Sequence, residues 1–209
     1  LRQSAVASFA TANADEAVMR KIANIATSDP SRVTRATAIS VLAAHNPTNY
    51  KSIFMAGVND SSYSVAGASL IALADIDQPS VMSLLPGLKK DAEGSLKGAI
   101  EEVEVQQKKD EDFPAITAQL DSLRGFSKFS KIRMYLMFLR NVQSTENFKK
   151  GVDRVVALRT MVAPLSAESK NFLNGQLEVL KSKKLARRNE QNAAATDEQV
   201  KYLDEKIKG

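Results

Sequence analysis

Apolar residues recur along the first half of the chain at helical spacing and also with a longer, 31-residue period. Ile22, Ile53 and Leu84 follow one another at this constant 31-residue spacing. Around each of them, apolar positions follow the i, i+3/i+4, i+7 pattern of an amphipathic helix. A fixed period of this length is typical of helical hairpins that bury their apolar faces only by stacking on one another. The pattern therefore predicts a helical repeat array.

Each period contains two apolar stripes, so we expect a first helix, a short turn and a second helix in every unit. A spacing of 32 aligns the second helices at Val6, Ala38 and Leu70. The last second helix, near residues 94–107, is expected to leave this register. The helices are predicted over 2–12, 15–27, 48–59 and 94–107, with others following Asp29-Pro30, Asp60 and Gln78-Pro79.

Three aspartates share the period of the apolar residues. Asp29, Asp60 and Asp91 repeat with the same 31-residue spacing, and each precedes a predicted second helix. Aspartate is a preferred N-cap residue and stabilises a helix by about 1 kcal/mol there. We interpret the three residues as helix caps, the alternative being a ladder of ligands.

The second half of the chain shows helical stripes without the 31-residue register. Longer amphipathic helices are predicted over residues 126–143, 146–163 and 167–184, after a shorter one that starts near Asp110 and ends at Gly125. Residues 189–197 are polar and predict a linker or a frayed end, followed by a short helix over 196–208. The predicted domains are a helical repeat array (1–108), a helical capping bundle (109–188) and a polar linker with a short terminal helix (189–209).

Composition supports this all-α interpretation and limits the chemistry. Aromatic residues make up 6% of the chain and cysteine is absent, which excludes disulfides, thiolate metal sites and a cysteine nucleophile. No stretch approaches the roughly 20 apolar residues of a transmembrane helix. The chain starts at Leu1 without a methionine or the features of a signal peptide, so we expect it to be a piece of a longer protein.

The net charge of +5 is unevenly distributed. Counted from the sequence, residues 1–90 carry +2, residues 91–122 carry −6 and residues 123–209 carry +9. The strongest basic run is Lys181, Lys183, Lys184, Arg187 and Arg188. Since no aromatic residue interleaves with this run, nucleic-acid binding is the less favoured interpretation. Basic residues at a helix C-terminus are favourable for the helix itself.

Two further groups could carry chemistry. His45 is the single histidine, so a zinc site with two histidines cannot form, and its place at a helix end favours a structural role. An acidic patch has no tight glycine loop of the kind that gathers oxygens around a cation, so we interpret it as a solvated face and a helix cap. Its members are Glu101, Glu102, Glu104, Asp110, Glu111 and Asp112. We assign no catalytic, cofactor-binding or metal-binding residue.

The stretch Asp29-Pro30-Ser31-Arg32-Val33-Thr34-Arg35-Ala36 resembles the HEAT-repeat pattern, in which an Asp-Pro turn leads into a helix with Val and then Ala. The start of the chain, Leu1-Arg2-Gln3-Ser4-Ala5-Val6, is similar to the same helix start. This resemblance covers residues 1–107 and implies an α-α superhelix, a HEAT-like solenoid, closed here by the C-terminal helical bundle.

A narrower resemblance is to the HEAT-like C-terminal region of aminopeptidase N-like zinc metallopeptidases. It implies a non-catalytic domain that shapes access to the active site and stabilises the catalytic module. The family's His-Glu-x-x-His and Gly-x-Met-Glu-Asn motifs are absent from this chain. Zinc and hydrolase activity would therefore belong to a catalytic domain of the same parent chain. The alternative is a HEAT scaffold that binds proteins. The sequence does not indicate the cellular compartment.

Overall fold

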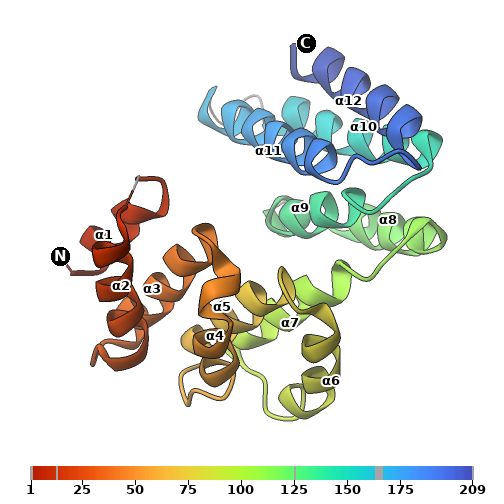
Figure 1. Cartoon of the computed structure of the whole chain (residues 1–209). Helices are drawn as coiled ribbons and strands as arrows, with labels where there is room; N and C mark the ends of the chain where they lie inside the picture. Colours follow the sequence, from red (N-terminus) through yellow and green to blue (C-terminus); the bar gives the residue numbers. More distant parts are fainter. Residues whose placement is uncertain (1, 13, 125, 163–166, 209) are drawn as a thin grey trace. The chain divides into compact units, whose positions relative to one another are not determined.

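The computed structural model describes residues 2–12, 14–124, 126–162 and 167–208. Every regular element in this part of the chain is a helix, which confirms the all-α prediction. The chain divides into two compact units, Leu1–Val103 and Glu104–Gly209 (Figure 1). Each unit has its own cluster of buried apolar side chains.

Unit 1 is a succession of short helices in which α3 contacts α1, α2 and α5, and α5 also contacts α4 and α6. The last helix of the series, α7, runs two residues past the division between the units. The elements are α1 (Arg2–Ala7), η1 (Ser8–Ala10), α2 (Glu16–Ser28), α3 (Arg32–Ala44), η2 (Pro47–Tyr50), α4 (Lys51–Gly57), α5 (Tyr63–Ala74), α6 (Gln78–Leu88) and α7 (Gly94–Val105).

The helix starts of unit 1 follow the same 31-residue period as its sequence. The second helices begin at Arg32, Tyr63 and Gly94. The expected spacing of 32 is therefore wrong for α3, α5 and α7, and α7 stays in register. Burial follows the same period, because equivalent positions of successive second helices face the core. The buried rows are Thr34/Val65/Leu96, Ala38/Ser69/Ile100 and Val41/Ala72/Val103.

Glycine permits close packing at two positions of unit 1. A Cβ atom on Gly67 would lie 2.8 Å from the backbone oxygen of Ser95, in the first turn of α7. A Cβ atom on Gly57 would lie 3.1 Å from the Cβ of Ser69 in α5. By contrast, a Cβ atom on Gly87 or Gly98 would meet nothing within 4 Å.

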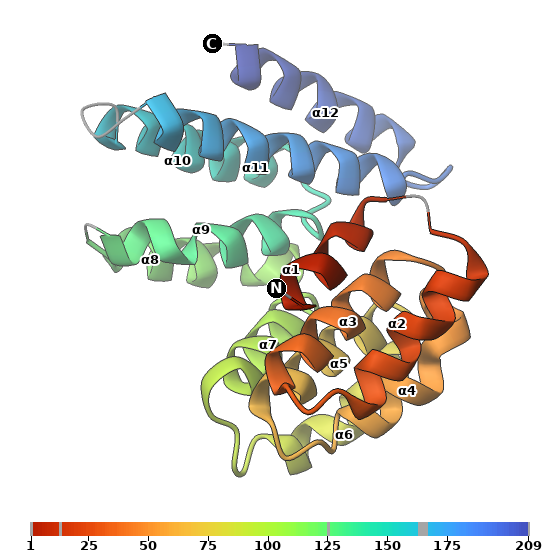
Figure 2. The same ribbon diagram turned by 90° about the vertical axis from the view of Figure 1, so that its left-hand side faces the viewer.

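Unit 2 contains longer helices than most of unit 1. Figure 2 shows α10 and α11 side by side, with α9 on one side of them and α12 on the other, in agreement with their contacts. Phe148 of α10 and Leu177 of α11 are fully buried in its core. The elements are η3 (Asp110–Asp112), α8 (Phe113–Ser122), α9 (Phe126–Leu139), α10 (Thr145–Val162), α11 (Ala167–Ala186) and α12 (Ala193–Lys208).

The structure differs from the expected elements mainly near the end of the chain. α12 begins at Ala193, so the predicted linker or frayed end over 189–197 is only a short turn. The side chain of Asn192 accepts a hydrogen bond from the backbone N–H of Asn189 and donates one to Arg187 O, which orders that turn. α9 ends at Leu139 instead of residue 143. The expected helix end at Gly125 lies outside the described residues.

Candidate functional site: the α9–α10 loop and the basic end of α11

Several polar side chains of unit 2 bind to the α9–α10 loop, residues Arg140–Ser144. It begins where α9 ends, and the last carbonyls of a helix lack partners within the helix. It ends where α10 starts, and the first N–H groups of a helix lack partners in the same way. Side chains from η3, α11 and α12 bind to backbone groups of the loop between these two helix ends, as the following contacts show.

Two side chains donate to the loop carbonyls. Lys184 of α11 places Nζ 2.6 Å from Val142 O and 3.4 Å from Arg140 O. Gln199 of α12 places Nε2 3.4 Å from the same Val142 O and 3.0 Å from Gln143 O. Both side chains are buried. The loop that follows α9 therefore joins α11 and α12, which share the acceptor Val142 O.

The carboxylate of Asp110 accepts from two loop amides. Its Oδ2 accepts from Gln143 N at 2.8 Å, and its Oδ1 accepts from Ser144 N at 2.9 Å. A carboxylate at the start of a helix also interacts favourably with the helix dipole. Ser144 then caps α10, since its Oγ accepts from Asn147 N at 3.3 Å. Asp110 thus fixes the entry into α10 from a distant part of the sequence.

Asn141 links the loop to the segment that precedes η3. Its Nδ2 donates to Gln106 O at 2.8 Å and to Lys108 O at 3.2 Å. Its Oδ1 accepts from Arg187 Nη1 at 2.6 Å. One amide side chain therefore connects the end of α11 with residues at the start of unit 2.

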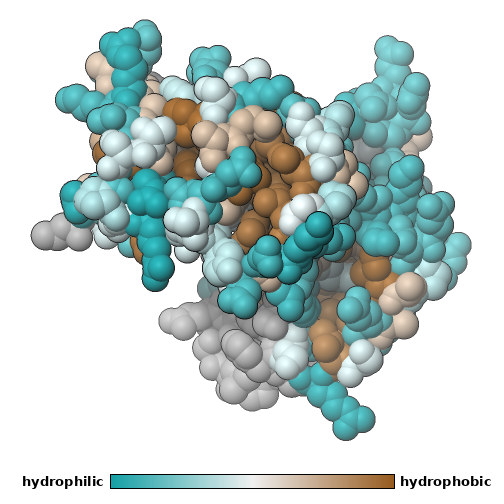
Figure 3. Space-filling view, turned by 90° about the horizontal axis from the view of Figure 1, so that it is seen from below, coloured by the Kyte–Doolittle hydropathy of each residue, from teal (hydrophilic) through white to brown (hydrophobic). Residues whose placement is uncertain are grey.

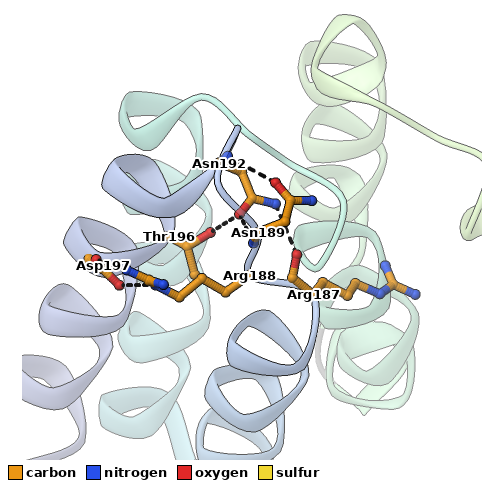
Figure 4. Close-up of polar contacts among 6 residues, drawn as sticks. All are labelled: Arg187, Arg188, Asn189, Asn192, Thr196 and Asp197. Atoms are coloured by element: carbon orange, nitrogen blue, oxygen red, sulfur yellow. Dashed lines mark hydrogen bonds and ion pairs between the residues drawn. The ribbon is translucent and has the colours of Figure 1, made fainter.

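Most of the basic run is engaged in contacts within unit 2. Arg188 forms a two-pronged pair with Asp197 of α12, with Nε–Oδ1 at 2.7 Å and Nη2–Oδ2 at 2.8 Å (Figure 4). This pair lowers the pKa of Asp197 and raises the pKa of Arg188, chiefly through its hydrogen bonds. Lys181 binds Asp204 of α12 at 2.6 Å. The run thus ties α11 to α12.

Lys184 is the member of the run with the most unusual surroundings. It is 3% exposed, and its Nζ lies 5.0 Å from the centre of the Phe148 ring. Burial disfavours an ammonium group and is the main cause that lowers the pKa of Lys184 to about 8. The run looks uniform in the sequence, and nothing there separates this buried lysine from its exposed neighbour Lys183.

Two residues of the acidic patch predicted from the sequence have structural roles. Asp110 holds the α9–α10 loop, and Asp112 Oδ2 accepts from Lys109 N at 2.9 Å. The latter hydrogen bond is the first cause that lowers the pKa of Asp112. Glu102 is 8% exposed, so the predicted solvated face is wrong for this residue.

The predicted N-cap role of the aspartate row is wrong for its first two members. The caps of α3 and α5 are Ser31 and Ser62. Asp29 Oδ1 accepts from Ser31 N and Asp60 Oδ1 accepts from Ser62 N, both at 2.8 Å. Each aspartate therefore orders the turn two residues before its cap. Asp91 lies three residues before α7 begins.

The same two aspartates accept ion pairs from the preceding repeat. Arg2 of α1 lies 3.2 Å from Asp29, and Arg35 of α3 lies 3.2 Å from Asp60. Arg35 also donates to Asp29 O at 3.0 Å. An arginine in one second helix thus reaches the turn that opens the next.

A second row with the same period precedes the first helices, and it was not predicted from the sequence. Asp15, Asn46 and Asp77 repeat with the 31-residue spacing. Asp15 caps α2 by accepting from Val18 N, and Asp77 caps α6 by accepting from Ser80 N. Asn46 precedes η2 in the left-handed conformation, without a side-chain cap bond. The spacing itself was the signal that could have identified this row.

His45 ends α3 and its Nε2 lies 2.7 Å from Phe9 O. It therefore joins α3 to η1. Among the described residues, no group of three His, Cys, Asp or Glu side chains is placed to hold a metal ion. No helix in the described part of the chain is long and apolar enough to cross a bilayer.

Comparison of the chain with protein-family models, curated proteins and solved structures gave no match. The resemblance to HEAT repeats and to zinc aminopeptidases therefore rests on the sequence pattern. The arrangement of the candidate site is suited to holding helix ends together, since its charged and amide groups bind backbone atoms and one another.

Proposed function

We propose that this chain is the non-catalytic, HEAT-like C-terminal domain of a zinc aminopeptidase, where it shapes access to the active site and stabilises the catalytic module. The sequence resemblance supports the family, and the 31-residue recurrence of helices supports a repeat domain. One observation carries the structural role. The polar residues singled out from the sequence, among them Asp110, Lys184 and Arg188, bind helix ends and neighbouring helices.

Zinc and the chemistry would then belong to the catalytic module of the parent chain. The donor set of this chain does not suit a catalytic zinc ion, which takes three protein ligands from His, Cys or carboxylates. The single histidine is bound to Phe9 O. The partners of this domain would be the catalytic module and, where the repeat units border the substrate chamber, the peptide substrate.

The test begins with the coding sequence that precedes Leu1, where we expect a module with His-Glu-x-x-His. The parent enzyme and a version that ends before Leu1 are then compared on short and long peptides. We expect the shortened enzyme to lose thermal stability and to change its kcat/KM ratio between the two peptide lengths. A parent without a zinc-binding module overturns the proposal.

The isolated chain supplies the matched control. Purified alone, it is expected to hydrolyse no aminoacyl substrate and to carry no stoichiometric zinc by elemental analysis. Zinc at unit stoichiometry would place a metal site in this chain and contradict the assignment of no metal ligand.

A protein-binding scaffold is the second candidate, and exposed apolar side chains favour it. Figure 3 shows apolar residues gathered at the surface in the view from below. Large apolar side chains that are at least 40% exposed are Val33, Tyr63, Met82, Phe172, Val179 and Leu185. Three of them, Phe172, Val179 and Leu185, belong to α11, where they would supply the apolar contacts of such an interaction site. Under this alternative, Val179→Asp abolishes capture of a protein partner, whereas Val179→Ala weakens it only slightly. Equal capture by both variants excludes α11 as the binding face.

A further inference from the structure

The ammonium group of Lys184 is buried against acceptors that carry no charge. Its nearest contacts are the carbonyl oxygens of Val142 and Arg140. The ring of Phe148 in α10 covers it at 5.0 Å from the centroid. Burial of a charge without an ion pair of opposite charge in direct contact is unfavourable. A neutral amine would keep hydrogen bonds to the same carbonyls, because it still has N–H donors.

The charged groups around Lys184 come from three elements and oppose one another. Asp110 of η3 favours the protonated amine, but its two oxygens are already bound to Gln143 N and Ser144 N. Arg187, one turn along the basic end of α11, disfavours the protonated amine. Arg140 of the loop is also positively charged, and its backbone oxygen accepts from Lys184. The residue of α12 that shares Val142 O is Gln199, which is uncharged.

We propose that Lys184 is a proton-sensitive latch: when it takes up a proton, opening of the contact between the α9–α10 loop, α11 and α12 becomes more favourable, and when it loses the proton, the closed form becomes more stable. The physical reason is that opening returns the ammonium group to water. The closed form offers it only carbonyl dipoles, a ring face and a carboxylate that is already engaged.

The sign of the pH dependence follows from the pKa of Lys184 in the two forms. In the closed form this pKa is about 8, and the ordinary value of 10.5 applies when the side chain is in water. Between these values the open form binds more protons than the closed form, so stability rises as pH increases. Below pH 8 both forms are protonated, and this contribution no longer changes. The latch is therefore loosest below pH 8 and gains strength from pH 8 to 10.5.

The pKa of Lys184 can be measured directly in the intact chain. Lysine residues labelled with ¹³C at Cε are followed by NMR from about pH 6 to about pH 11, a range that includes the pKa values of Lys184 in both forms. We expect one lysine signal to titrate near pH 8, and the same signal to be missing in Lys184→Arg. Titration of every lysine above pH 10 would overturn the latch.

The consequence for stability is measured by denaturant unfolding at several pH values, with Lys184→Met as the test variant. The unfolding constant of the original chain is divided by that of the variant at each pH. This ratio is expected to fall as pH rises, by up to roughly 300-fold between the two pKa values of Lys184. Lys183→Met is the matched control, because Lys183 is exposed on the same helix, and its ratio should stay constant. A constant ratio for Lys184→Met contradicts the proposal. If that variant does not fold, the NMR titration of the original chain decides.

Discussion

The two units of this protein differ in how their side chains bind backbone groups at and near helix ends. Local caps prevail in unit 1, although His45 reaches Phe9 O from 36 positions away, whereas long-range contacts converge on one loop of unit 2. Unit 1 uses residues next to the helix that they cap, as at Asp15 and Asp77, which lie two 31-residue periods apart. Unit 2 adds contacts between residues far apart in the sequence. Asp110 binds amides 33 and 34 positions away, and Lys184 binds a carbonyl 42 positions away.

This contrast explains where sequence patterns carry information about polar contacts. A contact between near neighbours that recurs with the fold leaves a periodic trace, as Asp29 and Asp60 do. A contact that is made once, between distant segments, leaves none. The recurring polar contacts of unit 1 can therefore be predicted from the sequence, whereas in unit 2 only the helices can.

The contrast is tested most strongly at the close helix approach in unit 1. Gly67→Ala places a Cβ atom 2.8 Å from the backbone oxygen of Ser95, which cannot move aside as the end of a side chain can. We expect the free energy of unfolding to fall by about 2–3 kcal/mol through overpacking. Urea unfolding followed by circular dichroism measures it.

Gly98→Ala is the matched control, since a Cβ atom there meets nothing within 4 Å. It should stabilise the protein by up to about 1 kcal/mol through helix propensity. Equal effects of the two substitutions would show that the stability of the protein does not depend on the close approach of α5 and α7 at Gly67.

The second prediction concerns the long-range contacts of unit 2. Asp110→Ala removes the acceptor of both Gln143 N and Ser144 N, so two helix-entry amides lose their partner. We expect a loss of about 1–3 kcal/mol in the free energy of unfolding. Glu111→Ala alters the next residue, which is exposed, and should change stability by less than about 0.5 kcal/mol. A neutral result for Asp110→Ala would show that water replaces the carboxylate at no cost.

The third prediction tests the ion pairs between neighbouring repeats. The side chains of Arg35 and Asp60 are 18% and 24% exposed, whereas that of Arg2 is 68% exposed. Arg35→Met should lower the free energy of unfolding by about 1 kcal/mol, because it also loses a bond to Asp29 O. Arg2→Met should cost less than about 0.5 kcal/mol, as exposed pairs contribute little. Identical losses would indicate that exposure does not decide the value of these pairs.

The weakest effect is expected from acid titration of a local cap. Hydrogen bonds from Lys51 and Ser80 lower the pKa of Asp77 from 3.8 to about 2. The carboxylate therefore contributes stability above pH 3.8, and this contribution is lost as pH falls from 3.8 towards 2. Asp77→Asn should flatten this part of the stability curve, while Asp75→Asn should leave it as in the original chain. A curve for Asp77→Asn that keeps the original slope would assign the acid sensitivity to other carboxylates.

Sequence alone was enough to establish the helical class and the 31-residue repeat. Both follow from where apolar residues recur, because each helix must bury one stripe of its surface. The sequence also indicated that Asp29 and Asp60 open the second helices, but they were assigned the cap itself, which Ser31 and Ser62 form. An aspartate two residues before a serine permits both arrangements, and only the backbone geometry selects one.

Only the packed structure revealed which charged residues are buried or paired. Lys183 and Lys184 are adjacent and identical in the sequence, yet one is exposed and the other is enclosed by Phe148 and the α9–α10 loop. The position of Asp110 beside the start of α10 was equally hidden. These contacts join segments that are distant in the sequence, and their free energy depends on which helices pack together, a property that local periodicity does not encode.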